Sequence, residues 1–184
     1  VVVIIIFITL LLPLAIVWLI GGSGEGQSPI ESGTVSVYVS EEDCVKDMDI
    51  NEYLKCVVAA EMPADFEEEA LKAQAVAART YLYSHIAEKD KGNIAESHNG
   101  AAICTDSTHC QAYISEDKRR ESWGDSADEN WNKISTAVDE TTGQIMTYND
   151  EIISAVFHST SSGMTESAVD VWGADVPYLQ SVTS

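Results

Sequence analysis

The sequence is poor in basic residues, with 10 lysines and arginines against 30 aspartates and glutamates, for a formal net charge of −20 at pH 7. A protein that binds nucleic acid or another long polyanion needs a face rich in lysine and arginine. We therefore exclude nucleic acid as a partner. Cysteine is scarce as well. The four cysteines suffice for two disulfides in an oxidising compartment, but their spacing does not settle whether these form.

Charge of either sign is absent from residues 1–22, which are almost wholly apolar. A helix of about 20 such residues crosses the hydrocarbon core of a bilayer, and Pro13 is tolerable inside a membrane helix. A cleaved signal peptide is the alternative, but its apolar core is usually about 7–15 residues long. We expect a transmembrane anchor at 1–22. No lysine or arginine precedes Lys46, so the basic flank that fixes orientation is missing, and we expect the natural chain to start earlier.

Residues 23–33 are rich in glycine and serine, as in a flexible linker, and residues 34–184 amount to about one domain. Apolar alternation predicts a strand over 35–40, and apolar residues three and four apart predict a helix over 49–63. Pro63 ends that helix. The remaining expected elements are a helix from 65–67 onward, an irregular polar stretch over 87–130, a helix around 131–138, and a strand–turn–strand over 144–160.

This order of elements indicates an α+β fold, in which helices pack on small antiparallel sheet elements in a single extracytoplasmic domain. The chain ends at YLQSVTS without a visible closing element. We therefore expect the domain to continue beyond residue 184.

The glutamates of EMPADFEEEALKAQAVAARTY, residues 61–81, are not equivalent. Glu61 follows Leu54 by seven residues, which places it on or near the apolar side of its helix. Apolar surroundings favour the protonated form of a carboxyl group, as a general acid requires. Glu69, at the start of the next helix, is the rival candidate. Arg79 lies among alanines and, if buried, should need a carboxylate partner.

A second cluster lies in HNGAAICTDSTHC, residues 98–110: His98, Cys104, His109 and Cys110. Two thiolates and two imidazoles are the usual ligands of a four-coordinate structural zinc ion, which has no open position for water. The spacing differs from that of a zinc finger, because adjacent residues must both reach one ion. A Cys104–Cys110 disulfide with exposed histidines is the alternative. Cys44 and Cys56 lack nearby histidines and are expected to be buried thiols or an unrelated pair.

A third cluster lies in FHSTSSGMTE, residues 157–166. His158 with several serines invites a serine-hydrolase interpretation, but the Gly-x-Ser-x-Gly pattern is absent. A hydroxyl-rich loop is often only a turn. Its functional interpretation is a set of hydrogen-bonding groups for sugar hydroxyls, contributed by His158, Ser159 and Ser161.

Together these segments resemble the stage II sporulation protein D family over roughly residues 33–184. The resemblance rests on four blocks in the same order and with similar spacing: NEYLKCVVAAEMPADFEEEALKAQAVAARTY, TDSTHCQAY, TTGQIMTYNDEIISAVFHSTSSGMTE and VPYLQSV. It implies a membrane-anchored lytic transglycosylase that cuts the MurNAc–GlcNAc β-1,4 bond of peptidoglycan glycan strands without stem peptides. Such enzymes act in engulfment of the forespore, facing the cell wall or intermembrane space, with an amidase, stage II sporulation protein P, and a membrane protein, stage II sporulation protein M.

The resemblance assigns the essential acid to Glu61, with Glu69 behind it. It also implies zinc at the four His/Cys residues, as in some clostridial members, although members without the cysteines show that the metal is not general to the chemistry. Residues expected to orient the acid or grip sugar are Arg79, Tyr81, His158, Ser159 and Ser161. Some relatives modify amidases, so a non-catalytic wall-binding module or amidase enhancer is the alternative. A zinc hydrolase is a weaker one.

Overall fold

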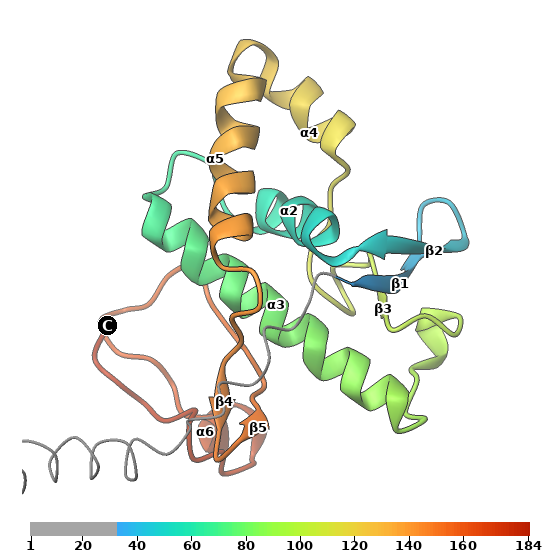
Figure 1. The fold of residues 1–184 in the computed structure, drawn as a ribbon. Helices are drawn as coiled ribbons and strands as arrows, with labels where there is room; N and C mark the ends of the chain where they lie inside the picture. Colours follow the sequence, from blue (N-terminus) through green and yellow to red (C-terminus); the bar gives the residue numbers. More distant parts are fainter. Residues whose placement is uncertain (1–32) are drawn as a thin grey trace, which may run out of the picture. The chain divides into compact units, whose positions relative to one another are not determined.

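The computed structural model describes residues 33–184, and it begins with a β-hairpin (Figure 1). Strand β1 (Thr34–Val39) pairs antiparallel with β2 (Cys44–Asp49) through all six residues of each. The short strand β3 (Ile103–Cys104) joins the other edge of β1 in parallel, so the sheet order is β2-β1-β3. The alternating valines of β1 point into the core, which confirms the predicted strand.

Three helices make most of the core: α2 (Ile50–Glu61), α3 (Glu68–Asp90) and α5 (Ala127–Glu140). Asp49 caps α2, since its carboxylate accepts bonds from the amides of Asn51 and Glu52. Helix α2 ends at Glu61, and Met62 is extended, as the residue before Pro63 should be.

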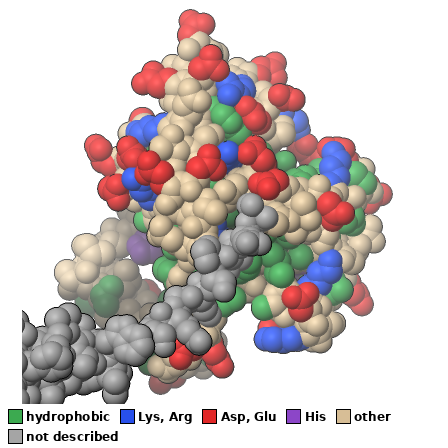
Figure 2. Space-filling view, in the orientation of Figure 1, with side chains coloured by type: hydrophobic (Ala, Val, Ile, Leu, Met, Phe, Trp, Pro, Cys, Tyr) green, Lys and Arg blue, Asp and Glu red, His purple; other side chains and the backbone are tan. Residues whose placement is uncertain are grey.

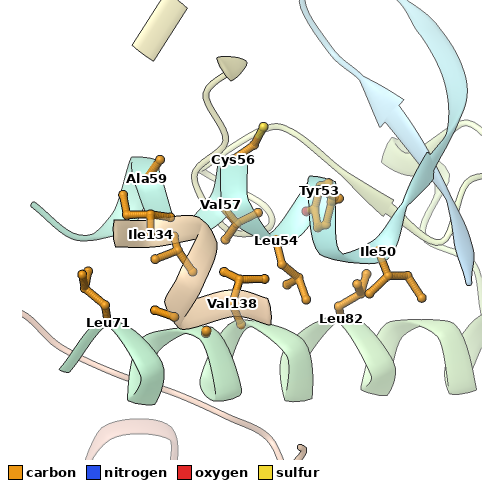
Figure 3. Packing of buried hydrophobic residues seen from close by; sticks show 14 of the residues in the cluster. Ile50, Tyr53, Leu54, Cys56, Val57, Ala59, Leu71, Leu82, Ile134 and Val138 are labelled. Carbon is orange, nitrogen blue, oxygen red and sulfur yellow. The ribbon is translucent and has the colours of Figure 1, made fainter. Parts of the chain in front are cut away.

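The apolar side chains of α2 meet those of α3 and α5, as Figure 3 shows. Leu54 and Val57 of α2, Leu71 and Leu82 of α3, and Val138 of α5 are fully buried. Helix α5 confirms the helix expected around 131–138.

The smaller elements are η1 (Glu96–His98), α4 (Glu116–Trp123), η2 (Gly124–Ser126), β4 (Thr147–Tyr148), β5 (Glu151–Ile152) and α6 (Ala168–Trp172). Asn149 and Asp150, both with positive φ, join β4 to β5, as in a type I′ hairpin turn. This confirms the predicted turn and, in part, the strands predicted over 144–160, since each strand has only two residues and none continues beyond Ile152 in this stretch. The expected α+β architecture is present, although the sheets are small and β3 pairs in parallel.

The prediction of an irregular stretch over 87–130 was wrong in part. Helix α3 continues to Asp90, and α4 and the start of α5 lie within this range. Helix α4 buries none of its residues, so it has no apolar stripe by which periodicity could reveal it.

None of the helices within residues 33–184 has the length and apolar character needed to cross a bilayer. The expected anchor at 1–22 lies outside the described residues. Figure 2 shows acidic side chains spread over the visible face, with the few basic ones among them.

Candidate functional site

Glu61 stands at the last residue of α2, and its side chain is half-buried. Its Oε1 accepts a hydrogen bond of 2.7 Å from the backbone amide of Ala112, which is 51 residues away in sequence. Among residues 33–184, no hydrogen bond to its other carboxyl oxygen is present. One oxygen is therefore fixed by the protein, and the second can interact with a ligand.

The rival acid Glu69 has a different environment. Its side chain is 85% exposed, and it forms an ion pair with Lys72 at 3.1 Å. Lys72 also pairs with Glu68 at 2.9 Å and with Glu140 at 2.7 Å. These acids raise the pKa of Lys72 and hold it as a surface cation. Glu69 thus belongs to a solvated charge network, without the apolar surroundings that a general acid uses.

The four predicted metal ligands come together in space. His98 ends η1, Cys104 ends β3, and the turn that follows carries His109 and Cys110. Their ligating atoms all lie within 4.8 Å of one another. The carbonyl of Asp106 accepts bonds from the amides of both His109 and Cys110, at 3.1 and 2.7 Å. Because of this tight turn, the adjacent residues His109 and Cys110 can both face a single ion. The turn thus explains how neighbours in the sequence could bind the same metal.

The distances within this His/Cys cluster fit a metal ion. A tetrahedral zinc ion with bonds of about 2.0–2.1 Å to nitrogen and about 2.3 Å to sulfur separates two nitrogens by about 3.3 Å and a nitrogen from a sulfur by about 3.6 Å. His98 Nε2 lies 3.1 Å from His109 Nδ1 and 3.2 Å from Cys110 Sγ. His109 Nδ1 lies 3.4 Å from Cys110 Sγ and 3.6 Å from Cys104 Sγ. Both cysteines are free thiols, so the cluster can hold a metal ion.

The electrostatics of the cluster agree with this geometry. Burial lowers the pKa of His98 and so favours the neutral imidazole that binds metals. Burial also raises the pKa of the Cys110 thiol to about 11. A thiolate at that position therefore needs a neighbouring cation, which a divalent metal supplies.

Tyr81 lies beside this cluster. Its hydroxyl is next to the Cys110 thiol, and burial raises the pKa of the phenol. Its ring stacks at 4.2 Å on His85, whose Nδ1 lies 2.9 Å from the Tyr81 carbonyl oxygen. Tyr81 therefore contacts the His/Cys cluster at Cys110.

Arg79, which we predicted to orient the acid or bind sugar, lies in the core of the fold. The side chain is only 1% exposed, so it has no surface to offer a ligand. The expected carboxylate partner is also missing among residues 33–184. Instead, the guanidinium donates to the carbonyls of Thr141 at 2.6 Å and Val138 at 2.9 Å, and to Asn51 Oδ1 at 3.3 Å. Arg79 caps the end of α5, where free carbonyls and the helix dipole favour a cation.

The third cluster contributes to a separate pocket of about 580 Å³, formed by the loop over 156–166, helix α6 and residues 178–182. His158 and Ser161 line it, whereas Ser159 is exposed and lies outside the lining. Phe157 and Trp172 also line it. Neither Glu61 nor a metal ligand does, so the structure does not bring all predicted site residues into one pocket.

Sequence reasoning missed two residues beside the candidate site, Ala112 and Gln111. Ala112 acts through its backbone amide, which no side-chain pattern can reveal. Gln111 is only 5% exposed, and neither polar atom of its side chain has a hydrogen-bond partner. A buried polar group of this kind is recognisable only once the fold is known.

Comparison with known proteins shows the family to which the chain belongs. A family model described as "Stage II sporulation protein" matches residues 38–148, which contain Glu61 and all four ligands of the His/Cys cluster. The chain belongs to the stage II sporulation protein D family.

Individual relatives agree. The chain is 38% identical over 164 residues to stage II sporulation protein D of Bacillus subtilis, with 88% of this chain and 47% of the relative covered. It is 39% identical over 158 residues to the protein of that name from Bacillus amyloliquefaciens, with 86% and 44% covered. An amidase enhancer of B. subtilis is 37% identical over 126 residues, which cover 68% of this chain and 14% of that protein. The chain spans about half the length of the two sporulation relatives.

Proposed function

We propose that this protein is a lytic transglycosylase that cleaves the MurNAc–GlcNAc β-1,4 bond of denuded peptidoglycan strands and leaves 1,6-anhydro-MurNAc ends. The observation that carries the proposal is the environment of Glu61 in a member of this family. One carboxyl oxygen is held by the Ala112 amide, while the other accepts no hydrogen bond from the residues that the structure describes. Glu69, in contrast, is exposed and paired with Lys72.

The reaction needs one carboxyl group used twice. Protonated Glu61 donates its proton to the glycosidic oxygen while an oxocarbenium-like centre develops at the MurNAc anomeric carbon. The resulting carboxylate then accepts the proton of the MurNAc C6 hydroxyl, whose oxygen closes the anhydro ring. Water is not consumed, so no second carboxylate at a fixed distance is required, unlike in a two-acid hydrolase.

The other groups have supporting roles in this proposal. Zinc at the His/Cys cluster is structural, because four protein ligands leave no open position for water. Tyr81 helps to orient the acid from its place beside the Cys110 thiol. His158, Ser159 and Ser161 contact sugar hydroxyls. Residues 1–22 anchor the protein in the cell membrane with the domain on the wall side. During forespore engulfment it acts with stage II sporulation proteins P and M.

The direct test incubates the protein with denuded glycan strands and measures 1,6-anhydro-MurNAc ends by mass spectrometry. Glu61→Gln keeps the shape of the side chain and an oxygen for the Ala112 amide, but it cannot transfer a proton. We expect its rate to fall at least about 100-fold. Glu69→Gln is the matched control and should cleave at nearly the rate of the unchanged protein. Cleavage by Glu61→Gln at an undiminished rate would remove Glu61 from the mechanism.

The similarity to an amidase enhancer supports a second candidate, a non-catalytic module that binds glycan and stimulates an amidase. The same digestion separates the two candidates. Glycan binding and amidase stimulation without anhydro ends from the unchanged protein would favour the module over the enzyme.

A further inference from the structure

The segment Cys110–Ile114 connects the His/Cys cluster to Glu61. Cys110 is a ligand of the cluster, and Ala112, two residues later, donates its amide to the Glu61 carboxyl at 2.7 Å. The cluster and the candidate acid are therefore joined by a very short piece of chain. At its fullest extension, two residues span only about 7 Å.

The downstream side of this segment is attached to helix α2. The Ile114 amide donates to the Cys56 carbonyl at 3.4 Å, and the Tyr113 ring stacks on Tyr53 with ring centres 5.8 Å apart. Arg119 Nε then donates to the Ala59 carbonyl at 2.8 Å.

The upstream side is held differently. The buried Gln111 side chain makes no hydrogen bond within the described part of the chain, so none fixes the chain between the cluster and Ala112. The chain is attached there through Cys110. Its thiol belongs to the His/Cys cluster, and its backbone amide donates a hydrogen bond of 2.7 Å to the Asp106 carbonyl. Within the described residues, the Ala112 amide is thus attached upstream through Cys110, a member of the His/Cys cluster.

We infer that the Ala112 amide is a positioning group for Glu61 and that metal binding at the His/Cys cluster sets its place, so that the metal centre controls the orientation of the acid without taking part in the chemistry. This inference rests on the proposed role of Glu61. Beyond the structural role proposed for it, the metal would then act on one hydrogen bond, the one from the Ala112 amide to Glu61.

The first test measures hydrogen exchange of single backbone amides in the protein loaded with Zn²⁺ and after chelation. Loss of a hydrogen bond to a carboxyl group should speed exchange of the Ala112 amide about tenfold or more. The Ile114 amide, bonded to α2, is the internal control and should change much less. Unchanged exchange of Ala112 after metal removal would overturn the inference, and so would an equal rise at both amides.

The second test removes the donor itself. Ala112→Pro has no amide hydrogen, so it cannot donate to Glu61. Ser115→Pro is the matched proline control, because Ser115 has φ −63° and donates no backbone hydrogen bond among the described residues. We expect Ala112→Pro to bind one Zn²⁺ per chain and to lose about tenfold or more in kcat with little change in KM. The Ser115→Pro control should retain the unchanged kcat.

A zinc-loaded Ala112→Pro variant with full kcat would also overturn the inference. If Ala112→Pro does not fold, the exchange measurement on the unchanged protein decides. The exchange test does not depend on catalysis. Absence of anhydro products from the unchanged protein therefore refutes the proposed function, whereas normal cleavage with uncoupled exchange refutes only this inference.

Discussion

Replacing Arg79 with methionine tests whether this residue stabilises the fold or binds substrate. Its guanidinium donates to the Val138 and Thr141 carbonyls at the end of α5. A buried hydrogen bond from a charged donor contributes about 1.5–3 kcal/mol, so two such bonds amount to about 3–6 kcal/mol. Methionine removes the cost of burying a charge, which offsets part of the loss. We expect a net destabilisation of about 3–5 kcal/mol, in the range found when one member of a buried polar pair is removed.

The measurement is urea and thermal unfolding followed by circular dichroism. For a chain of this size, 3–5 kcal/mol corresponds to a fall in Tm of about 6–20 °C. Arg120→Met is the control, because Arg120 pairs at the surface with Glu116 and Asp128 and should cost about 1 kcal/mol or less. An Arg79→Met variant of unchanged stability with a raised KM for glycan would refute the structural role and restore substrate binding.

Three further predictions concern helix α2. Asp49→Ala removes the cap that accepts from two amides and should cost about 1 kcal/mol in urea unfolding; no loss would show that the cap is dispensable. Leu54→Ala, at a fully buried position, should cost about 2–5 kcal/mol in the same assay, and a cost below 1 kcal/mol would contradict the packing. Burial raises the pKa of Cys56 from 9.0 to about 11. The unfolded chain therefore loses this proton first, and stability should fall by up to about 3 kcal/mol as pH rises from 9 to 11. Cys56→Ala should reduce the decline by this amount, while the Cys110 thiol, whose pKa is also about 11, still contributes its own share. An unaltered pH profile would contradict the role of Cys56.

The −20 charge is compatible with the fold, because the acidic side chains that carry it are mostly exposed. Two lysines with little exposure, Lys55 and Lys72, each pair with at least two acids.

The apolar patterns of the sequence were enough to predict the helices α2 and α5, the strand β1 and the hairpin turn at Asn149-Asp150. Each is determined locally, by side chains that repeat with the period of the element or by residues that tolerate positive φ. The proximity of His98, Cys104, His109 and Cys110 was predictable for a related reason, since groups close together in sequence need little tertiary structure to meet.

The strand β2 and the helix α4 were not predicted, because their residues are mostly polar and show no apolar periodicity. Two contacts between distant parts of the chain were not predictable either. Arg79 meets carbonyls about 60 residues later in the chain, and Glu61 meets the Ala112 amide 51 residues later. Sequence alone predicted that Glu61 lies on or near the apolar side of its helix. Only the tertiary structure decided what holds it, because a backbone amide is the same at every position until the fold selects one.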